Sequence, residues 1–228
     1  MTKPVERSTR ATTVYEELRA EILHGAYAPG EKLGIEAIAS AHGVGNNAVR
    51  EALSRLAAER LVDRHERRGY TAPVMDLDAW RELVRTRCWV EGLALRKSME
   101  QRTDAWEDAI ALAYHRLARI GRASDVEARR AEWHVEHRTF HRALIANCGS
   151  HWLTDFCDQL ADQATRYIHI ANLIGNHGRD GNLEHEQLMK TALEGTAEEA
   201  EAALTEHYLK TLRAVEALLP VTEVSKAP

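Results

Sequence analysis

The sequence has little of what would place a protein in a membrane, outside the cell or in a disulfide-bonded fold. Its 228 residues include no run of eighteen or more apolar residues, so no transmembrane helix is expected. Its first residues, MTKPVERSTR, lack the apolar segment of a secretory signal. Its three cysteines form no C-x-x-C pair, and their odd number argues against a disulfide framework. These absences predict a cytoplasmic globular protein.

The chain also lacks the excess of positive charge that is typical of a nucleic-acid-binding domain, because its formal net charge is −5. The charge is unevenly divided, since residues 1–75 carry 11 Lys/Arg against 10 Asp/Glu and residues 76–228 carry 19 against 25. Basic residues gather near the end of the first part, at Arg60, Arg64, Arg67 and Arg68. Such a patch can bind phosphate on an acidic protein, although most such clusters are simply solvated.

Hydrophobic periodicity in the N-terminal part predicts three helices followed by a β-hairpin. Val14, Leu18 and Ile22 share one face of the first helix, and Val49, Leu53 and Leu56 share one face of the third. The Pro29-Gly30 pair imposes a turn after the first helix. The predicted helices are Thr12–His24, a short one from Ile35 that Gly43 ends, and Asn46–Glu59, and the predicted strands are Leu61–Arg64 and Tyr70–Pro73. This order is typical of a winged helix-turn-helix.

The third predicted helix has a polar face that suits DNA reading. Its first turns present Asn46, Asn47 and Arg50, and asparagine can pair with adenine while arginine pairs with guanine or phosphate. Arg55 lies further along, where contact with the DNA backbone is expected, and the wing tip Arg67-Arg68-Gly69 could reach the minor groove or a phosphate. Alternatively, the asparagines cap the helix and Arg50 pairs with a nearby glutamate. The complete order of helices and hairpin favours DNA contact.

Beyond Pro73 the pattern changes to long amphipathic segments without a further convincing strand. The predicted helices are Asp78–Arg102, Thr103–Ile120, Ala128–Asn147, Ser150–Leu173, Leu183–Glu194 and Thr196–Leu219. Two of them begin in capping-box form, Ser124 with Glu127 and Thr196 with Glu199. We therefore predict an N-terminal tail (1–11), a DNA-binding domain (12–75), an all-α bundle (76–220) and a C-terminal tail (221–228).

Histidines are concentrated in the predicted bundle, where eight of the twelve lie between His134 and His207. His137 and His141 are one helical turn apart and form a natural two-ligand clamp for an ion such as Zn²⁺. Later helices each add a candidate, His185 after Glu184 and His207 after Glu206. A single histidine pair of this kind is often just an exposed pair, so the spacing alone leaves metal binding open.

Residues 14–74 contain three characteristic runs, LRAEILHGAYAPGEKL, HGVGNNAVREALSRLAAERLV and RRGYTAPV. Through these runs this part of the chain resembles the GntR family of bacterial regulators. Members of that family usually have S-R-T-P before V-R-E-A-L, whereas this chain has Gly45, Asn46, Asn47 and Ala48. Arg50 matches the arginine that the family retains. The resemblance implies DNA binding, and the departure implies an operator unlike that of typical relatives.

Residues 77–219 resemble the FCD effector domain of the FadR-type branch of that family, through the runs RTRCWVEGLALR, HRTFHRALIANCGSHWL and LEHEQLMKTALEGTAEEAEAALTEHYLKTL. The resemblance implies metal ligands at His137, His141, His185 and His207, with His137 at a position where aspartate is customary. Four imidazoles suit Zn²⁺ or Ni²⁺ and leave the ion its full charge, which favours an anionic ligand. The resemblance also implies a homodimer, which demands a roughly palindromic operator.

Two arginines are candidates for binding the carboxylate of an effector. Arg87 matches an arginine that the family carries on the first effector helix, although an intrahelical pair with Glu91 is an equal alternative. Arg166, with Tyr167, is a second candidate for lining the cavity. The tryptophans, among them Trp89, Trp133 and Trp152, are expected in the core.

Together these features predict a mainly α protein that acts as a DNA-binding regulator and not as an enzyme. Its operator affinity would respond to a small organic acid bound at a metal-containing cavity, and repression is the expected mode. One alternative is a regulator for which metal itself is the signal. A helical metalloenzyme is the other, but four protein ligands leave less room for a reacting water, and the sequence has no H-E-x-x-H motif.

Overall fold

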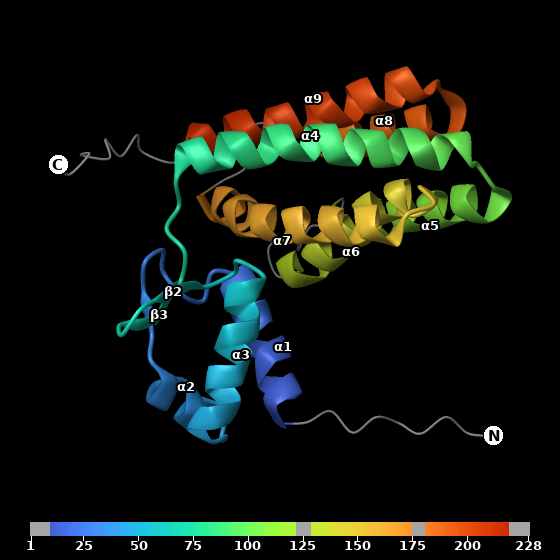
Figure 1. Cartoon of the computed structure of the whole chain (residues 1–228). Helices are drawn as coiled ribbons and strands as arrows, with labels where there is room; N and C mark the ends of the chain where they lie inside the picture. Colours follow the sequence, from blue (N-terminus) through green and yellow to red (C-terminus); the bar gives the residue numbers. More distant parts are fainter. Residues whose placement is uncertain (1–9, 122–128, 175–180, 219–228) are drawn as a thin grey trace, which may run out of the picture. The chain divides into compact units, whose positions relative to one another are not determined.

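The structure, a computed structural model, describes residues 10–121, 129–174 and 181–218 (Figure 1). The chain divides into two compact units, one of Met1–Asp76 with Thr165–Leu173 and the other of Leu77–Ala164 with Ile174–Pro228. The predicted cap at Ser124 and the predicted C-terminal tail lie outside the described residues, as does the predicted N-terminal tail except for its last two residues. None of the described helices combines the length and hydropathy needed to cross a bilayer.

The part of the first unit before Leu77 contains, over the described residues 10–76, three helices and a small sheet, as the sequence predicts for a winged helix-turn-helix. Its elements in chain order are α1 (Arg10–Leu23), β1 (Lys32–Leu33), α2 (Ile35–Ala41), α3 (Asn46–Ala58), β2 (Asp63–His65) and β3 (Gly69–Thr71). The predicted inward faces are confirmed, because the side chains of α1 and α3 that share a face are at most 3 % exposed: Val14, Leu18, Ile22, Val49, Leu53 and Leu56. These side chains join one hydrophobic core that holds α3 in place.

The sheet has one strand more than the predicted hairpin. Its order is β1-β3-β2 with antiparallel pairing throughout, and Leu33 lies opposite Tyr70. A strand of two residues shows no alternation, so β1 carries no periodic signal in the sequence. Tertiary pairing forms it, since the Ala72 amide donates to the Glu31 carbonyl at 2.8 Å.

The second unit is built from helices alone among its described residues, as predicted for the effector part. These helices are α4 (Leu77–Glu100), α5 (Asp104–Gly121), α6 (Arg130–Ile145), α7 (His151–Ile174), α8 (Gly181–Glu194) and α9 (Ala197–Glu216), with Thr165–Leu173 of α7 assigned to the first unit. Helix α4 lies beside α9, and α5 lies beside α6 (Figure 1). The start of α9 confirms its predicted capping box, because Glu199 and Thr196 each accept the other's backbone amide.

The prediction that the tryptophans lie in the core is wrong for two of them. Trp89 is 67 % exposed and Trp152 is 77 % exposed, whereas Trp80 and Trp106 are buried. Trp80 and Trp89 are nine residues apart on α4, and nine steps of an α-helix bring a side chain to the opposite face. One face of α4 therefore buries an indole while the other presents one.

Candidate DNA-reading surface and metal centre

The recognition helix α3 presents the residues that sequence analysis assigned to base reading. Asn46, Asn47 and Arg50 are exposed, on the side of the helix away from buried Val49 and Leu53. Such a division of faces keeps the polar side available to a duplex while the apolar side anchors the helix.

The structure contains neither of the alternatives to DNA contact, which were capping of the helix by the two asparagines and an ion pair between Arg50 and a glutamate. The N-cap of α3 is Gly45, in an extended conformation, and no side chain caps the helix, so Asn46 and Asn47 begin the helix instead of capping it. Within the described ranges Arg50 forms no ion pair with a carboxylate. The assignment of Arg50 to base reading stays a prediction.

Arg55 is held by contacts with neighbouring side chains, whereas the arginines of the wing are exposed. The Arg55 guanidinium carbon lies 3.9 Å from the centroid of the Tyr15 ring, a cation–π distance. The hydroxyl of Tyr15 in turn donates to Glu59 at 2.6 Å, so this arginine is oriented by the packing of α1 on α3. At the wing, Arg67 and Arg68 are exposed between β2 and β3. Gly69 has φ +90°, a conformation that glycine adopts without strain.

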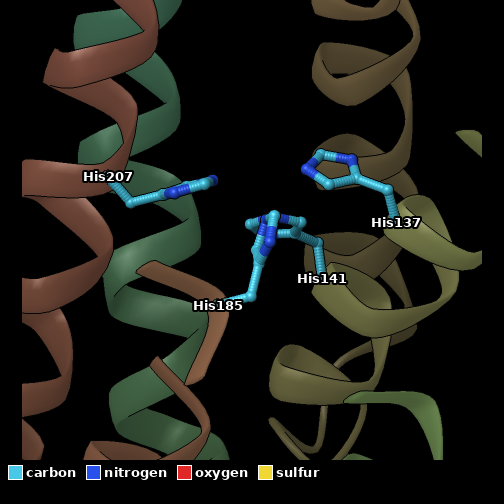
Figure 2. A group of neighbouring side chains, drawn as sticks. All are labelled: His137, His141, His185 and His207. Atoms are coloured by element: carbon cyan, nitrogen blue, oxygen red, sulfur yellow. The ribbon is translucent and has the colours of Figure 1, made fainter. Parts of the chain in front are cut away.

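Four histidines converge in the helical bundle, and they are the four that the resemblance to the FCD domain implied. His137 and His141 come from α6, His185 from α8 and His207 from α9 (Figure 2). One nitrogen from each ring lies within 4.8 Å of the corresponding nitrogens of the other three. His141, His185 and His207 are 7 %, 3 % and 5 % exposed. Packing has thus joined residues that are up to 70 positions apart.

The partners of two of these histidines determine which nitrogen would meet an ion. Nδ1 of His207 lies 2.9 Å from a carboxylate oxygen of Glu184, and Nδ1 of His141 lies 3.3 Å from the hydroxyl of Tyr208. Metal-bound histidines are commonly held in this way through the ring nitrogen that does not ligate. In both rings Nε2 is therefore the nitrogen that would bind an ion.

The residues present fit a divalent transition metal. Nitrogens bound at about 2.0–2.1 Å to one ion are separated by up to ~4.2 Å, so a spread of 4.8 Å needs only a small closure of the rings. Burial and then the neighbouring imidazoles lower the pKa of His137 well below its usual value, which keeps that ring neutral and able to ligate. Trp133 stacks on His137 with ring centroids 4.5 Å apart.

Arg87 is part of a buried ion pair beside this cluster. Its Nε donates to Glu91 at 2.6 Å, and the two residues are 6 % and 3 % exposed. Burial disfavours the charged guanidinium, but the Glu91 carboxylate outweighs this effect and the pKa of Arg87 is raised. The structure thus contains the intrahelical pair that the sequence left as one of two alternatives. A role of Arg87 in binding an effector remains a prediction.

Arg166, the other arginine predicted for effector binding, contacts the segment after the wing. Its Nη2 donates to the backbone carbonyl of Pro73 at 2.5 Å, and the hydroxyl of the adjacent Tyr167 donates to the carbonyl of Asp76. This contact gives no support to the effector assignment of Arg166, which also remains a prediction.

Sequence analysis did not name Tyr208, and it named Glu91 and Glu184 only as neighbours of Arg87 and His185. Two of these residues are adjacent in sequence to a histidine of the cluster: Glu184 precedes His185, and Tyr208 follows His207. Adjacent residues on a helix point about 100° apart, so proximity in sequence does not predict that they share a partner. Their contacts depend on the neighbouring helix.

Comparison with known proteins gives matches over both parts of the chain. Residues 10–71 match the family model described as "Bacterial regulatory proteins, gntR family", and residues 82–210 match the model of the FCD domain. The uncharacterized HTH-type transcriptional regulator BphR of Paraburkholderia xenovorans (strain LB400) is 34 % identical over 88 % of this chain and 83 % of its own length. The HTH-type transcriptional repressor GlaR of Escherichia coli (strain K12) is 32 % identical, over 68 % of this chain and 71 % of its own.

Solved structures share the fold. E. coli McbR/YncC has a TM-score of 0.77 at 19 % identity and covers 93 % of this chain and 99 % of its own. A putative GntR transcriptional regulator from Rhodococcus sp. RHA1 has a TM-score of 0.73 at 21 % identity, with coverage of 92 % and 99 %. Together with the exposed recognition helix, the family matches and relatives show that the chain belongs to the gntR family of DNA-binding transcriptional regulators and carries an FCD domain.

Proposed function

We propose that this protein is a cytoplasmic, homodimeric repressor whose operator affinity is set by a small organic acid bound at a metal ion in its helical bundle. The observation that carries the proposal is the convergence of four imidazoles from three helices in a chain that also presents a recognition helix. A ligand that binds one arrangement of the dimer better than another shifts the population toward that arrangement, and operator affinity shifts with it.

Zinc or nickel is the ion we propose. Imidazole nitrogen suits both, whereas magnesium, calcium and manganese prefer oxygen ligands. All four ligands are neutral, so the bound ion keeps its full charge of +2 and attracts an anionic group. A carboxylate that reaches the ion would complete its coordination and would carry the effector signal.

Exposed apolar side chains support the proposed homodimer. Trp89 and Leu93 lie one turn apart on α4, and Trp152 and Phe156 lie one turn apart on α7, all at least 45 % exposed. Aromatic residues of this kind are enriched at protein interfaces. A two-fold dimer would present two α3 helices and would demand a roughly palindromic operator.

Replacing Arg50 by alanine should weaken binding to an operator selected from random duplex DNA by about 1–3 kcal/mol and relax sequence preference at one position. The reason is the loss of a bidentate contact with a base edge. Fluorescence anisotropy at fixed salt measures the change. Arg116→Ala, an exposed arginine on α5 with the same change of charge, is the control and should bind as the wild type does. Equal affinity of Arg50→Ala and wild type would remove Arg50 from the base-reading surface.

His141→Ala should lose most of the metal that the wild-type protein retains after purification, because one of four ligands is deleted from a buried set. Elemental analysis of the purified proteins measures the metal per chain. His115→Ala, an exposed histidine on α5, should retain the wild-type content. Equal metal in His141→Ala and wild type would overturn the site.

The wild-type protein and the His141→Ala variant also distinguish an organic acid as the signal from the alternative in which the metal itself is sensed. Anisotropy titrations of operator DNA are run with added zinc or nickel and then with a series of small organic acids. A response to an acid only in the metal-loaded protein supports the proposal. A full response to the metal alone would replace the organic effector with the ion.

A further inference from the structure

The hydroxyl of Tyr208 lies at the centre of a buried network beside the four histidines. It is 2.5 Å from Oε2 of Glu91, 3.0 Å from Nη2 of Arg87 and 3.3 Å from Nδ1 of His141. Tyr208 is 3 % exposed, so water has little access to replace these partners. The network joins α4, which carries Arg87 and Glu91, to α9 and α6.

The position of the hydroxyl proton follows from these distances. Glu91 is the ion-pair partner of Arg87 at 2.6 Å and, as a carboxylate, can only accept a hydrogen bond. Two oxygens at 2.5 Å repel each other unless a proton lies between them, so the hydroxyl of Tyr208 donates to Glu91. The guanidinium of Arg87 contains only donor groups and no acceptor atom. Its Nη2 therefore donates to the same hydroxyl oxygen.

This assignment decides the tautomer of His141. The only hydrogen of the Tyr208 hydroxyl is engaged with Glu91, so toward His141 the oxygen offers a lone pair. Nδ1 of His141 must then carry the ring proton and donate it, because two facing lone pairs would repel. A neutral imidazole with its proton on Nδ1 has its free electron pair on Nε2.

We propose, on the basis of the metal site proposed above, that Tyr208, oriented by Arg87 and Glu91, is a positioning residue that holds His141 in the Nδ1–H tautomer required for ligation through Nε2. The other tautomer would direct an N–H bond toward the ion and would have to be rearranged before binding. Arg87 and Glu91 thereby have a function beside the ligands without contacting the ion themselves.

The tautomer is measured directly on the metal-free protein. Long-range ¹H–¹⁵N NMR spectra distinguish Nδ1–H from Nε2–H imidazole, and the resonances of His141 are assigned by their loss in His141→Gln. The wild type should show the Nδ1–H form at neutral pH. Tyr208→Phe, which deletes only the hydroxyl, should shift His141 toward the Nε2–H form. The proposal would be overturned if His141 were in the Nε2–H form in the wild type. It would also be overturned if His141 had the same tautomer in Tyr208→Phe as in the wild type.

Metal affinity supplies a second readout. Zinc titration against a competing chelator should show an affinity for Tyr208→Phe that is about 10–100-fold weaker than that of the wild type. Tyr114→Phe is the matched control, since it removes a hydroxyl from α5 of the same unit, and its affinity should be unchanged. Wild-type affinity in Tyr208→Phe would refute the positioning role while leaving the metal site intact. Wild-type protein that binds no zinc would instead refute the metal site.

Discussion

Replacing Glu91 by leucine should lower the free energy of unfolding of the metal-free protein by about 3–5 kcal/mol. Glu91 and Arg87 are 3 % and 6 % exposed, and their charged atoms lie 2.6 Å apart. Removal of the carboxylate leaves a buried guanidinium without its counter-charge, and the hydroxyl of Tyr208 also loses its acceptor. Arginine cannot shed its proton to escape this cost. Denaturant unfolding followed by circular dichroism measures the change.

Two further variants test whether the burial of the unpaired charge causes the loss of stability expected for Glu91→Leu. Glu201→Leu breaks the contact of Arg96 with Glu201 at 2.5 Å, a pair that also joins α4 to α9 but is about a third exposed, and should cost no more than about 1 kcal/mol. The double variant Arg87→Met/Glu91→Leu removes both buried charges and should recover most of the loss seen in Glu91→Leu. A loss in the double variant equal to that of Glu91→Leu would show that packing, and not the unpaired charge, is responsible.

Removal of the proposed metal ion should have the second large effect, a loss of stability. An ion that binds the folded chain stabilises it by about 4 kcal/mol when its free concentration is a thousand times its dissociation constant. In this chain the ion would tie α6 to α8 and α9 through His141, His185 and His207. At about 2–4 °C per kcal/mol for a domain of 150–250 residues, zinc should raise the melting temperature by roughly 8–16 °C. Calorimetry with zinc and with a chelator measures the shift.

The control for this shift is the same pair of scans on His141→Ala. Loss of one ligand should abolish most of the difference between zinc and chelator, whereas His115→Ala should show the full wild-type difference. A shift of wild-type size in His141→Ala would mean that zinc stabilises the protein through other residues. No shift in the wild type would mean that the four histidines do not hold an ion that is linked to folding.

Much of the architecture was predictable because each helix carries its own periodic pattern. The buried faces of α1 and α3 follow from the spacing of Val14, Leu18, Val49 and Leu53, and the box at Thr196 follows from one hydroxyl and one carboxylate three residues apart. The strand β1 was not predicted because alternation of apolar and polar residues cannot be recognised over only two residues. It exists because β3 offers it a partner.

What could be predicted of the candidate metal site divides in the same way. His137 and His141 are one turn apart on one helix, so the sequence alone places them together. His185 and His207 were connected to them only by the resemblance to the FCD domain. The structure adds the neighbours that orient the rings, Glu184 and Tyr208.

By itself, then, the sequence determined the helices, their buried faces, the exposed Asn and Arg of the recognition helix and one pair of candidate ligands. Only the tertiary structure decided that Arg87 is paired with Glu91, that the hydroxyl of Tyr208 joins this pair to His141, and that Trp89 and Trp152 face outward. The physical reason is that helical periodicity is a property of one segment. Which face meets which depends on the packing of side chains from helices far apart in the chain.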